Sequence, residues 1–245
     1  MCTVSFIPRK KGYAVAMNRD EKLTRDKGLP PKFHQVAGRT VLGPSEPGGG
    51  SWIAVNDTGA TLALINWYAV KAVVKTRALS RGVVVNSVRA AAGKDEIDST
   101  LAGLPLATIN PFRLIGIFPA TGEILEWRWD LKNLLRKKRP WKARQWISSG
   151  FDEPKARRTR SAIFRQEQLN SPAASLAWLR RLHRSHAPER GAFSTCMHRP
   201  DAMTVSCTEI ALTSRHATMR HHQGPPCRTR KQYVRRLRLK LARNG

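Results

Sequence analysis

Apolar and polar side chains alternate at the start of the chain and predict a β-hairpin. The alternation runs through Cys2–Pro8, and Tyr13–Met17 is rich in residues that favour strands. The polar segment Arg9–Gly12 between them predicts the turn.

The register of this hairpin decides which side chain lies beside Cys2. If Pro8 pairs with Tyr13 across the turn, Cys2 lies opposite Arg19. Directly opposed residues are roughly 4.5–5.5 Å apart, so a thiol and a guanidinium would be neighbours. Asp20 points to the opposite face of a regular strand. For both Arg19 and Asp20 to reach Cys2, the strand has to end or bulge near residue 20.

Similar alternating segments predict further hairpins and single strands. The hairpins are Ser51–Val55 with Ala60–Asn66 around the turn Asn56–Gly59, and Phe112–Phe118 with Glu123–Asp130 around Pro119–Gly122. The single strands are Gln145–Ser148, Ala192–His198, Met203–Leu212 and Ala217–His221.

Helical spacing and capping residues predict five helices. They are Ser80–Ala92, Asp95–Leu104, Pro154–Leu169, Pro172–Ser185 and Thr229–Arg243, with Ser80 and Asp95 as caps of the first two. Two segments lack a clear period: the Gly- and Pro-rich linker Gly28–Gly50, and Leu131–Arg144, a basic loop or short helix. Strand hairpins around a helical middle predict an α+β protein with mostly antiparallel sheets.

Composition limits the class of protein. The 41% hydrophobic content excludes wholesale disorder, and no apolar run approaches the roughly 18 residues of a membrane span. Arg9–Lys11 interrupts any secretory signal, and the four cysteines are too few and too scattered for a disulfide framework. These features predict a soluble cytoplasmic protein with one domain.

Charge is the unusual property of this chain. It has 44 Lys and Arg against 17 Asp and Glu, a net charge of +27, and Arg228–Arg243 is the densest basic block. Such an excess favours polyanion contact through counterion release. No aromatic RNA-binding run, helix-turn-helix or zinc-finger spacing accompanies it, so the expected contact through Arg228–Arg243 is non-specific.

Cys2 is the first candidate for chemistry. Removal of Met1 would give one residue both a thiol and a free α-amine, and an amine with a pKa near 7.7–8.0 is partly unprotonated at neutral pH and can act as a base. Arg19 beside it favours the thiolate. Asp20 is placed to orient the amine, and the Asn66 amide to bind the oxyanion of a tetrahedral intermediate.

The same residues carry a family resemblance. Met1–Thr3, followed by Asn18–Glu21 at the end of the next strand, resembles the NRDE family, also called the Transport and Golgi organisation protein 2 family. Further matching segments are Gly48–Asn56 with Gly59, Asn110–Phe112, Ser148–Asp152 with Arg157, Arg158 and Phe164, Cys196–Arg199, Thr204–Ser206 and Gly224–Cys227. The resemblance covers residues 1–227, which gives one NRDE-family domain followed by a basic C-terminal helix or tail at 228–245.

The resemblance implies a fold and a site. This family is similar to N-terminal-nucleophile hydrolases of the penicillin-acylase and bile-salt-hydrolase type, which implies a four-layer αββα sandwich. By position, the implied catalytic residues are Cys2, Arg19, Asp20 and Asn66. A second oxyanion asparagine is replaced by Ser148 and Ser149, Asn18 is a further oxyanion or substrate candidate, and a distal arginine is either Arg158 or Arg160.

Histidine and cysteine pairs offer weak candidates for metal or haem ligands. They are His183 with His186, Cys196 and Met197 with His198, and His221 and His222 with Cys227. None has a partner at zinc-finger or protease spacing, and no haem-attachment motif is present. The sequence therefore predicts neither a metal nor a cofactor.

Three functions remain open at this level. The first is a hydrolase that cleaves a non-peptide C–N amide bond with Cys2 as nucleophile. The alternative is a non-catalytic carrier of haem or a lipid-like ligand on the same fold, and the third is a basic polyanion-binding accessory.

Overall fold

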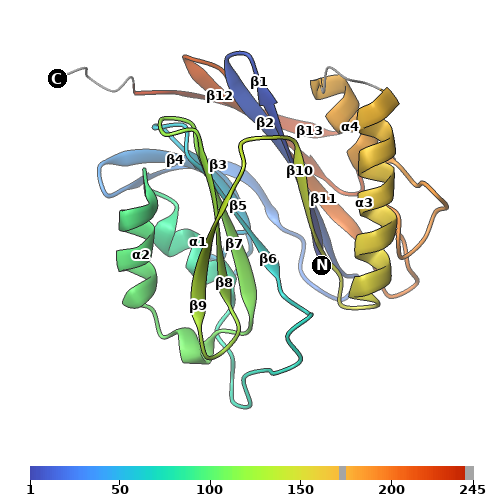
Figure 1. Cartoon of the computed structure of the whole chain (residues 1–245), viewed down its shortest axis with the longest axis horizontal. Coiled ribbons are helices and arrows are strands. Elements are labelled where there is room, and N and C mark those ends of the chain that lie inside the picture. Colours follow the sequence, from blue (N-terminus) through green and yellow to red (C-terminus); the bar gives the residue numbers. More distant parts are fainter. Residues whose placement is uncertain (171–174, 241–245) are drawn as a thin grey trace.

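The computed structural model describes residues 1–170 and 175–240, arranged in four layers (Figure 1). Two antiparallel sheets, here named sheet A and sheet B, face each other, and each has a pair of helices on its outer face. The predicted α+β class and the αββα sandwich are both confirmed.

Sheet A contains six strands in the order β10-β1-β2-β11-β12-β13. Their bounds are β1 Cys2–Arg9, β2 Gly12–Lys22, β10 Arg144–Ser148, β11 Ala202–Leu212, β12 His216–Gln223 and β13 Gln232–Arg238.

Sheet B contains seven strands in sequential order, β3 to β9. Their bounds are β3 Leu29–Val36, β4 Arg39–Ser45, β5 Ile53–Asn56, β6 Thr61–Asn66, β7 Phe112–Phe118, β8 Glu123–Trp129 and β9 Leu134–Arg139.

Four α-helices and one short 3-10 helix complete the described fold. They are α1 Gly82–Val88, α2 Lys94–Ala102, η1 Leu106–Thr108, α3 Glu153–Asn170 and α4 Leu176–Arg184. The helices α1 and α2 pack on sheet B, while α3 and α4 pack on sheet A. No helix in the described ranges is both long and apolar enough to cross a bilayer.

The core between the sheets is built by alternation along the strands. In β2, Val15 and Met17 enter this core, whereas Ala14 and Ala16 pack against α3 and α4. Both faces of β2 are therefore buried, which gives sheet A a fixed register at its centre.

The first hairpin confirms the predicted register. Pro8 pairs with Tyr13 and Cys2 pairs with Arg19. The hairpins formed by β5 with β6 and by β7 with β8 are also confirmed, and Gly59 at the end of the β5–β6 turn has φ 84°, the left-handed conformation that glycine tolerates.

The predicted linker Gly28–Gly50 is wrong, because most of it forms the hairpin of β3 and β4. Pro30 and Pro31 hide the strand pattern, and the pairing shifts between Leu29 and Lys32. The strand tolerates the prolines because β3 lies at the edge of sheet B, where one side of the backbone has no strand to pair with.

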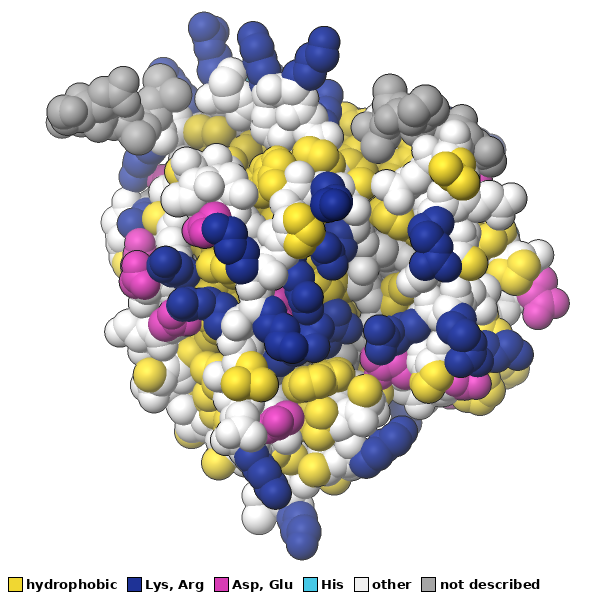
Figure 2. Space-filling view, in the orientation of Figure 1, with side chains coloured by type: hydrophobic (Ala, Val, Ile, Leu, Met, Phe, Trp, Pro, Cys, Tyr) yellow, Lys and Arg dark blue, Asp and Glu magenta, His cyan; other side chains and the backbone are white. Residues whose placement is uncertain are grey.

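Two basic segments are strands, which corrects the predictions for Leu131–Arg144 and for the C-terminal helix Thr229–Arg243. The first contains β9 and the second contains β13, each at an edge of its sheet. Residues 241–243 of the predicted helix lie outside the described residues. Figure 2 shows Lys and Arg outnumbering Asp and Glu across one face of the molecule.

The remaining differences concern bounds and caps. Ala192–His198 is not a strand but a looped segment, with one bridge between His198 and Met203. Neither Ser80 nor Asp95 is an N-cap, since α1 begins after Arg81 and α2 after Gly93. The predicted helix at Pro172–Ser185 is described only from Ser175, whose hydroxyl caps α4, and residues 171–174 lie outside the described part.

Candidate functional site

Cys2 lies at the open end of the first hairpin, between two other strand residues. It is 8% exposed, pairs with Arg19 on β2, and pairs with Ser148 on β10. Directly paired residues project from the same face of a sheet, so all three side chains point toward the space between the two sheets. A thiol, a guanidinium and a hydroxyl are therefore neighbours.

Arg19 is held by its own strand and by the segment that joins β4 to β5. Its guanidinium donates to the Glu46 carboxylate at 2.7 Å and to the Glu21 carboxylate at 3.5 Å, and it lies 4.7 Å from the ring centroid of Trp52. The side chain is thus fixed in position by two acids and an aromatic face.

The Asp20 side chain projects from the opposite face of β2, toward α3. Its carboxylate accepts a hydrogen bond from the Thr204 hydroxyl at 2.6 Å and one from Arg160 at 3.4 Å. Arg160 also donates to the Thr3 hydroxyl at 2.7 Å. The Asp20 and Arg160 side chains are buried, so this ion pair is shielded from water on the helix side of sheet A.

The strand neither ends nor bulges at residue 20, which differs from the sequence expectation. The strand β2 continues to Lys22, and the irregularity is in its neighbour β11, between Thr204 and Ser206. Asp20 reaches the N-terminus through its backbone: its carbonyl accepts from the Met1 amine and its N–H donates to the Met1 carbonyl, both at 2.8 Å.

Burial and charge act on the ionisable groups of Cys2 and Met1. Burial raises the pKa of the Cys2 thiol, and the positive Met1 amine and Arg19 partly oppose that rise. Burial works against the charged form of the Met1 amine, but the pKa of that amine is raised because acidic groups surround it: Cys2, Tyr68, Asp20 and Glu21.

The two serines at the end of β10 differ in their bonding. Ser148 has a buried hydroxyl with no hydrogen-bond partner among the described residues. The Ser149 hydroxyl lies 3.6 Å from the Met1 sulfur and accepts from the Phe151 N–H at 3.3 Å. Of the two serines, Ser148 is therefore the one whose hydroxyl remains available to donate a hydrogen bond beside Cys2.

Asn66 is hydrogen-bonded to Tyr68, a residue that the sequence reasoning missed. At the end of β6, its amide donates to the Tyr68 hydroxyl at 2.7 Å. The Tyr68 ring lies against Gly150, where an added Cβ would be only 3.1 Å from the ring. No strand or helix contains Tyr68, so no period in the sequence marked it.

The side chains of Asn18 and Arg160 form their hydrogen bonds on the helix side of sheet A. The Asn18 amide donates to the carbonyls of His183 and Thr195, each at 2.9 Å, so both its hydrogens are used. Of the two arginines left open by the sequence, the structure brings Arg160 to Asp20, whereas Arg158 is exposed and lines a surface cavity.

Arg81 is a second residue that the sequence reasoning missed. It is only partly exposed and donates to the Pro111 carbonyl at 3.3 Å. Burial lowers the pKa of its guanidinium, while nearby Tyr68 and Cys2 act in the opposite direction. Arg81 comes from the loop before α1, so only tertiary structure brings it to Cys2.

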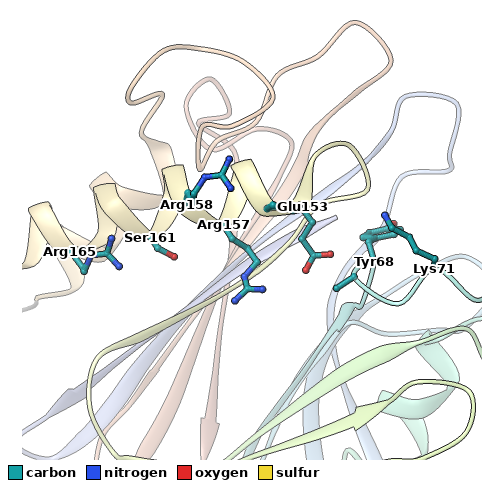
Figure 3. Close-up of a pocket in the computed structure, with 9 residues that line it drawn as sticks. Tyr68, Lys71, Glu153, Arg157, Arg158, Ser161 and Arg165 are labelled. Carbon is teal, nitrogen blue, oxygen red and sulfur yellow. The ribbon is translucent and has the colours of Figure 1, made fainter.

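A basic cavity of about 580 Å³ adjoins Tyr68 (Figure 3). Glu153 and Arg157 on α3 face Tyr68 and Lys71, which follow β6. The other charged residues that line it are Arg158 and Arg165. Four cations against one carboxylate make this cavity suited to an anionic group.

Most of the histidines that the sequence marked as weak ligands are bound elsewhere. His183 is buried between Asn18 and Ser5, and burial lowers its pKa to about 3. His221 contacts the Thr208 hydroxyl at 2.9 Å, and His222 contacts the Thr229 carbonyl at 3.2 Å. These three imidazoles form structural hydrogen bonds.

Comparison with protein families gives one match. A family model described as Transport and Golgi organisation 2 matches residues 1–125. No curated protein sequence matches the chain significantly.

Solved structures with the same fold include a bile acid hydrolase and a penicillin acylase. A mutant of conjugated bile acid hydrolase from Clostridium perfringens, in which alanine replaces a cysteine, superposes with a TM-score of 0.57 at 10% identity, covering 98% of this chain and 97% of the other. A second variant of that hydrolase, in which leucine replaces an arginine, gives 0.58 at 9% identity, covering 96% and 92%. Penicillin V acylase from Agrobacterium tumefaciens gives 0.50 at 11% identity, covering 89% and 82%. At these identities the likeness shows the fold.

Proposed function

Because the chain belongs to the Transport and Golgi organisation 2 family, and its fold is shared with a bile acid hydrolase and a penicillin acylase, we propose that it hydrolyses a non-peptide C–N amide bond with Cys2 as nucleophile. The observation that carries the proposal is the row of side chains between the sheets. Cys2 is flanked by a fixed guanidinium, Arg19, and by a hydroxyl without a partner among the described residues, Ser148.

The proposed reaction begins after removal of Met1. The Cys2 amine takes the thiol proton, the sulfur attacks the amide carbonyl carbon, and the amine leaving group departs with a proton. Water then cleaves the thioester and regenerates the thiol. Arg19 supports the thiolate against burial, because its positive charge lowers the pKa of the Cys2 thiol.

Two groups are proposed to bind the oxyanion. Ser148 has an unused hydroxyl next to Cys2, and Asn66 has a second amide hydrogen besides the one given to Tyr68. A donor aimed at the developing negative charge lowers the barrier because it costs no reorganisation during the reaction.

Asp20 and Arg160 are proposed as positioning residues. Their buried ion pair, with Thr3 and Thr204, fixes the backbone of β1 and β2 on the face opposite to Cys2. In this proposal the carboxylate acts through the strand that carries Arg19 and not by contact with substrate.

The cavity beside Tyr68 suggests the substrate class. Lys71, Arg157, Arg158 and Arg165 line it, against one acid, Glu153, whose pKa is raised by burial. We therefore propose an amide whose acyl or amine part carries a carboxylate or another anion.

The test uses the native, untagged chain. Intact mass spectrometry first establishes whether Met1 has been removed, and the protein is then screened against paired N-acyl amides that differ only in a carboxylate. Turnover that prefers the anionic member and disappears in Cys2→Ala, but not in the control Cys207→Ala, supports the proposal.

Two results would contradict it. Turnover that persists in Cys2→Ala excludes the nucleophile, and a chain that keeps Met1 has no Cys2 amine to act as base. Tight binding of haem or a lipid-like ligand without any turnover would instead favour the carrier function.

A further inference from the structure

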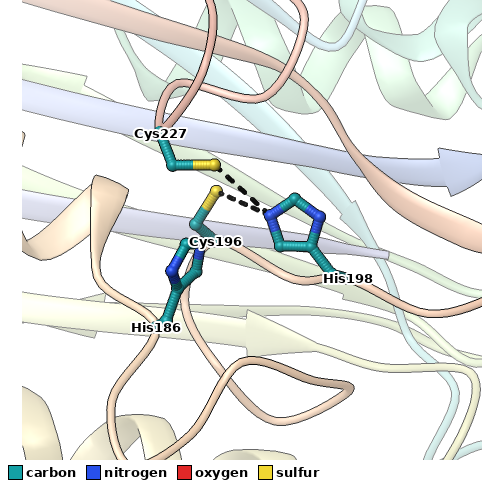
Figure 4. A group of neighbouring side chains, drawn as sticks. All are labelled: His186, Cys196, His198 and Cys227. Atoms are coloured by element: carbon teal, nitrogen blue, oxygen red, sulfur yellow. Dashed lines mark hydrogen bonds between the residues drawn. The ribbon is translucent and has the colours of Figure 1, made fainter.

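We propose that His186, Cys196, His198 and Cys227 form a tetrahedral site for a zinc ion. One ligand atom from each residue lies within 4.8 Å of all the others. Figure 4 shows both sulfur atoms facing the His198 ring, with His186 beside Cys196. The site is distinct from the row formed by Cys2, Arg19 and Ser148, so it holds whether or not Cys2 is a nucleophile.

The distances suit zinc. Zn²⁺ binds thiolate at about 2.3 Å and imidazole at about 2.0–2.1 Å, so the ligand atoms of a tetrahedral site are about 3.4–3.8 Å apart. His198 Nε2 is 3.7 Å from the Cys196 sulfur and 3.3 Å from the Cys227 sulfur. Small side-chain movements would bring all four atoms to bonding distance.

His186 provides a second observation. Its Nε2 atom is buried and has no hydrogen-bond partner in residues 1–170 and 175–240. Its ring centroid lies 5.1 Å from that of His198. A buried nitrogen without a partner carries a desolvation cost, which a metal bond would remove.

The donor set selects zinc among common divalent ions. Two thiolates and two imidazoles in a tetrahedron are typical of structural Zn²⁺, whereas Mg²⁺ and Ca²⁺ prefer oxygen ligands. Binding displaces one proton from each thiol, and the resulting group of one dication and two thiolates is neutral. A neutral group is compatible with a strongly basic chain.

Arg190 has to move when the metal binds. It donates to His198 Nδ1 at 3.3 Å, so Nδ1 is the acceptor and the single N–H proton of the neutral ring lies on Nε2. Metal binding at Nε2 requires the proton on Nδ1 instead. Arg190 is exposed, and this is its one side-chain hydrogen bond within the described chain, so it can turn into solvent.

The ion would link two loops beside the Asp20 ion pair. His186, Cys196 and His198 lie between α4 and β11, and Cys227 lies between β12 and β13. Between the ligands Cys196 and His198, the Met197 N–H donates to Thr204 Oγ1 at 2.8 Å, and that hydroxyl donates to Asp20. The ion would therefore fix the segment that holds the Asp20 carboxylate.

The test measures metal in the full chain. Protein purified without chelators is analysed for zinc, stripped with chelator under reducing conditions, and titrated with Co²⁺ as a spectroscopic probe. We expect about one zinc per chain, and a cobalt spectrum with the strong visible bands of a tetrahedral ion and a sulfur-to-cobalt charge-transfer band.

Variants locate the ligands. Cys196→Ser and Cys227→Ser should lose the charge-transfer intensity and the retained zinc, while the matched control Cys207→Ser, a buried cysteine on β11 outside the cluster, should keep both.

Three outcomes would overturn the proposal. They are the absence of a tetrahedral cobalt spectrum in the wild-type chain, equal zinc in Cys227→Ser and in the control, and a Cys196–Cys227 disulfide in protein alkylated at lysis. The wild-type titration decides the matter even if a variant fails to fold.

Discussion

Arg19 lies directly across from Cys2 in the pairing of β1 with β2, and its guanidinium donates at 2.7 Å to Glu46, which directly follows β4 of the opposite sheet. The cation next to the thiol is thus bound both by Glu21 on its own strand and by the segment that follows β4. The positive charge of Arg19 lowers the pKa of the Cys2 thiol, whereas the negative charge of Glu21 raises it.

Arg19→Leu should slow alkylation of Cys2. Loss of the positive charge raises the pKa of the thiol further, and each pKa unit reduces the thiolate fraction at a fixed lower pH by about tenfold. Iodoacetamide labelling of Cys2 across a pH series, followed by peptide mapping, measures the effect. Glu21→Gln is the control of opposite sign, because its carboxylate raises that pKa, and equal rates in both variants would refute the electrostatic account.

Ser148→Ala should separate activity from stability. The hydroxyl has no hydrogen bond to lose within the described chain, so the free energy of unfolding should change by less than about 1 kcal/mol. Under the proposed amide hydrolysis, kcat should fall by on the order of a hundredfold, as for loss of an oxyanion donor. Ser149→Ala, with its contacts to Met1 and Phe151, is the neighbouring control, and unchanged kcat in Ser148→Ala would remove Ser148 from the mechanism.

Arg160→Leu should destabilise the fold strongly. It leaves the Asp20 carboxylate buried without its cation, which costs about 3–5 kcal/mol in the free energy of unfolding. Arg158→Leu, an exposed position on the same helix, should change it by less than about 0.5 kcal/mol. Urea denaturation of the two variants and the wild type is the measurement. Similar midpoints for both variants would show that the ion pair has little effect on stability.

His183 should make stability depend on mildly acidic pH. The folded chain keeps this imidazole neutral with a pKa of about 3, whereas the unfolded chain takes up a proton below about pH 6.5. The contribution of the neutral His183 to the free energy of unfolding is therefore complete above about pH 6.5. It declines as the pH falls toward 3, by up to about 1.4 kcal/mol per pH unit. Denaturation of wild type and His183→Gln across this pH range should give free energies of unfolding that converge on acidification. Parallel curves for the two proteins would contradict the assignment.

The register of the N-terminal hairpin could be predicted because its pattern is local. A polar turn and two alternating strands fix the pairing of Cys2 with Arg19 without any distant contact. The edge strands could not be predicted in the same way. In β13, Tyr233 and Leu237 are four residues apart, a spacing that places two side chains on one face of a helix and also on one face of a strand.

The parts of the sites that come from loops were missed for another reason. Tyr68 and Arg81 follow no period, and they approach Cys2 only because the two sheets face each other. In the proposed zinc site, Cys227 lies 29 residues beyond His198, and no finger-like spacing marks it. Such a group becomes visible only when β11 and β12 bring the two loops together.

Met1 precedes β1 and continues its pairing with β2 by one residue, through two main-chain hydrogen bonds with Asp20. Its removal would do more than free an amine. It would leave one N–H and one C=O of Asp20 facing a gap the size of one strand residue, beside the thiol. Any molecule that enters there meets a ready donor and acceptor, spaced as one amide unit presents them to another in a sheet.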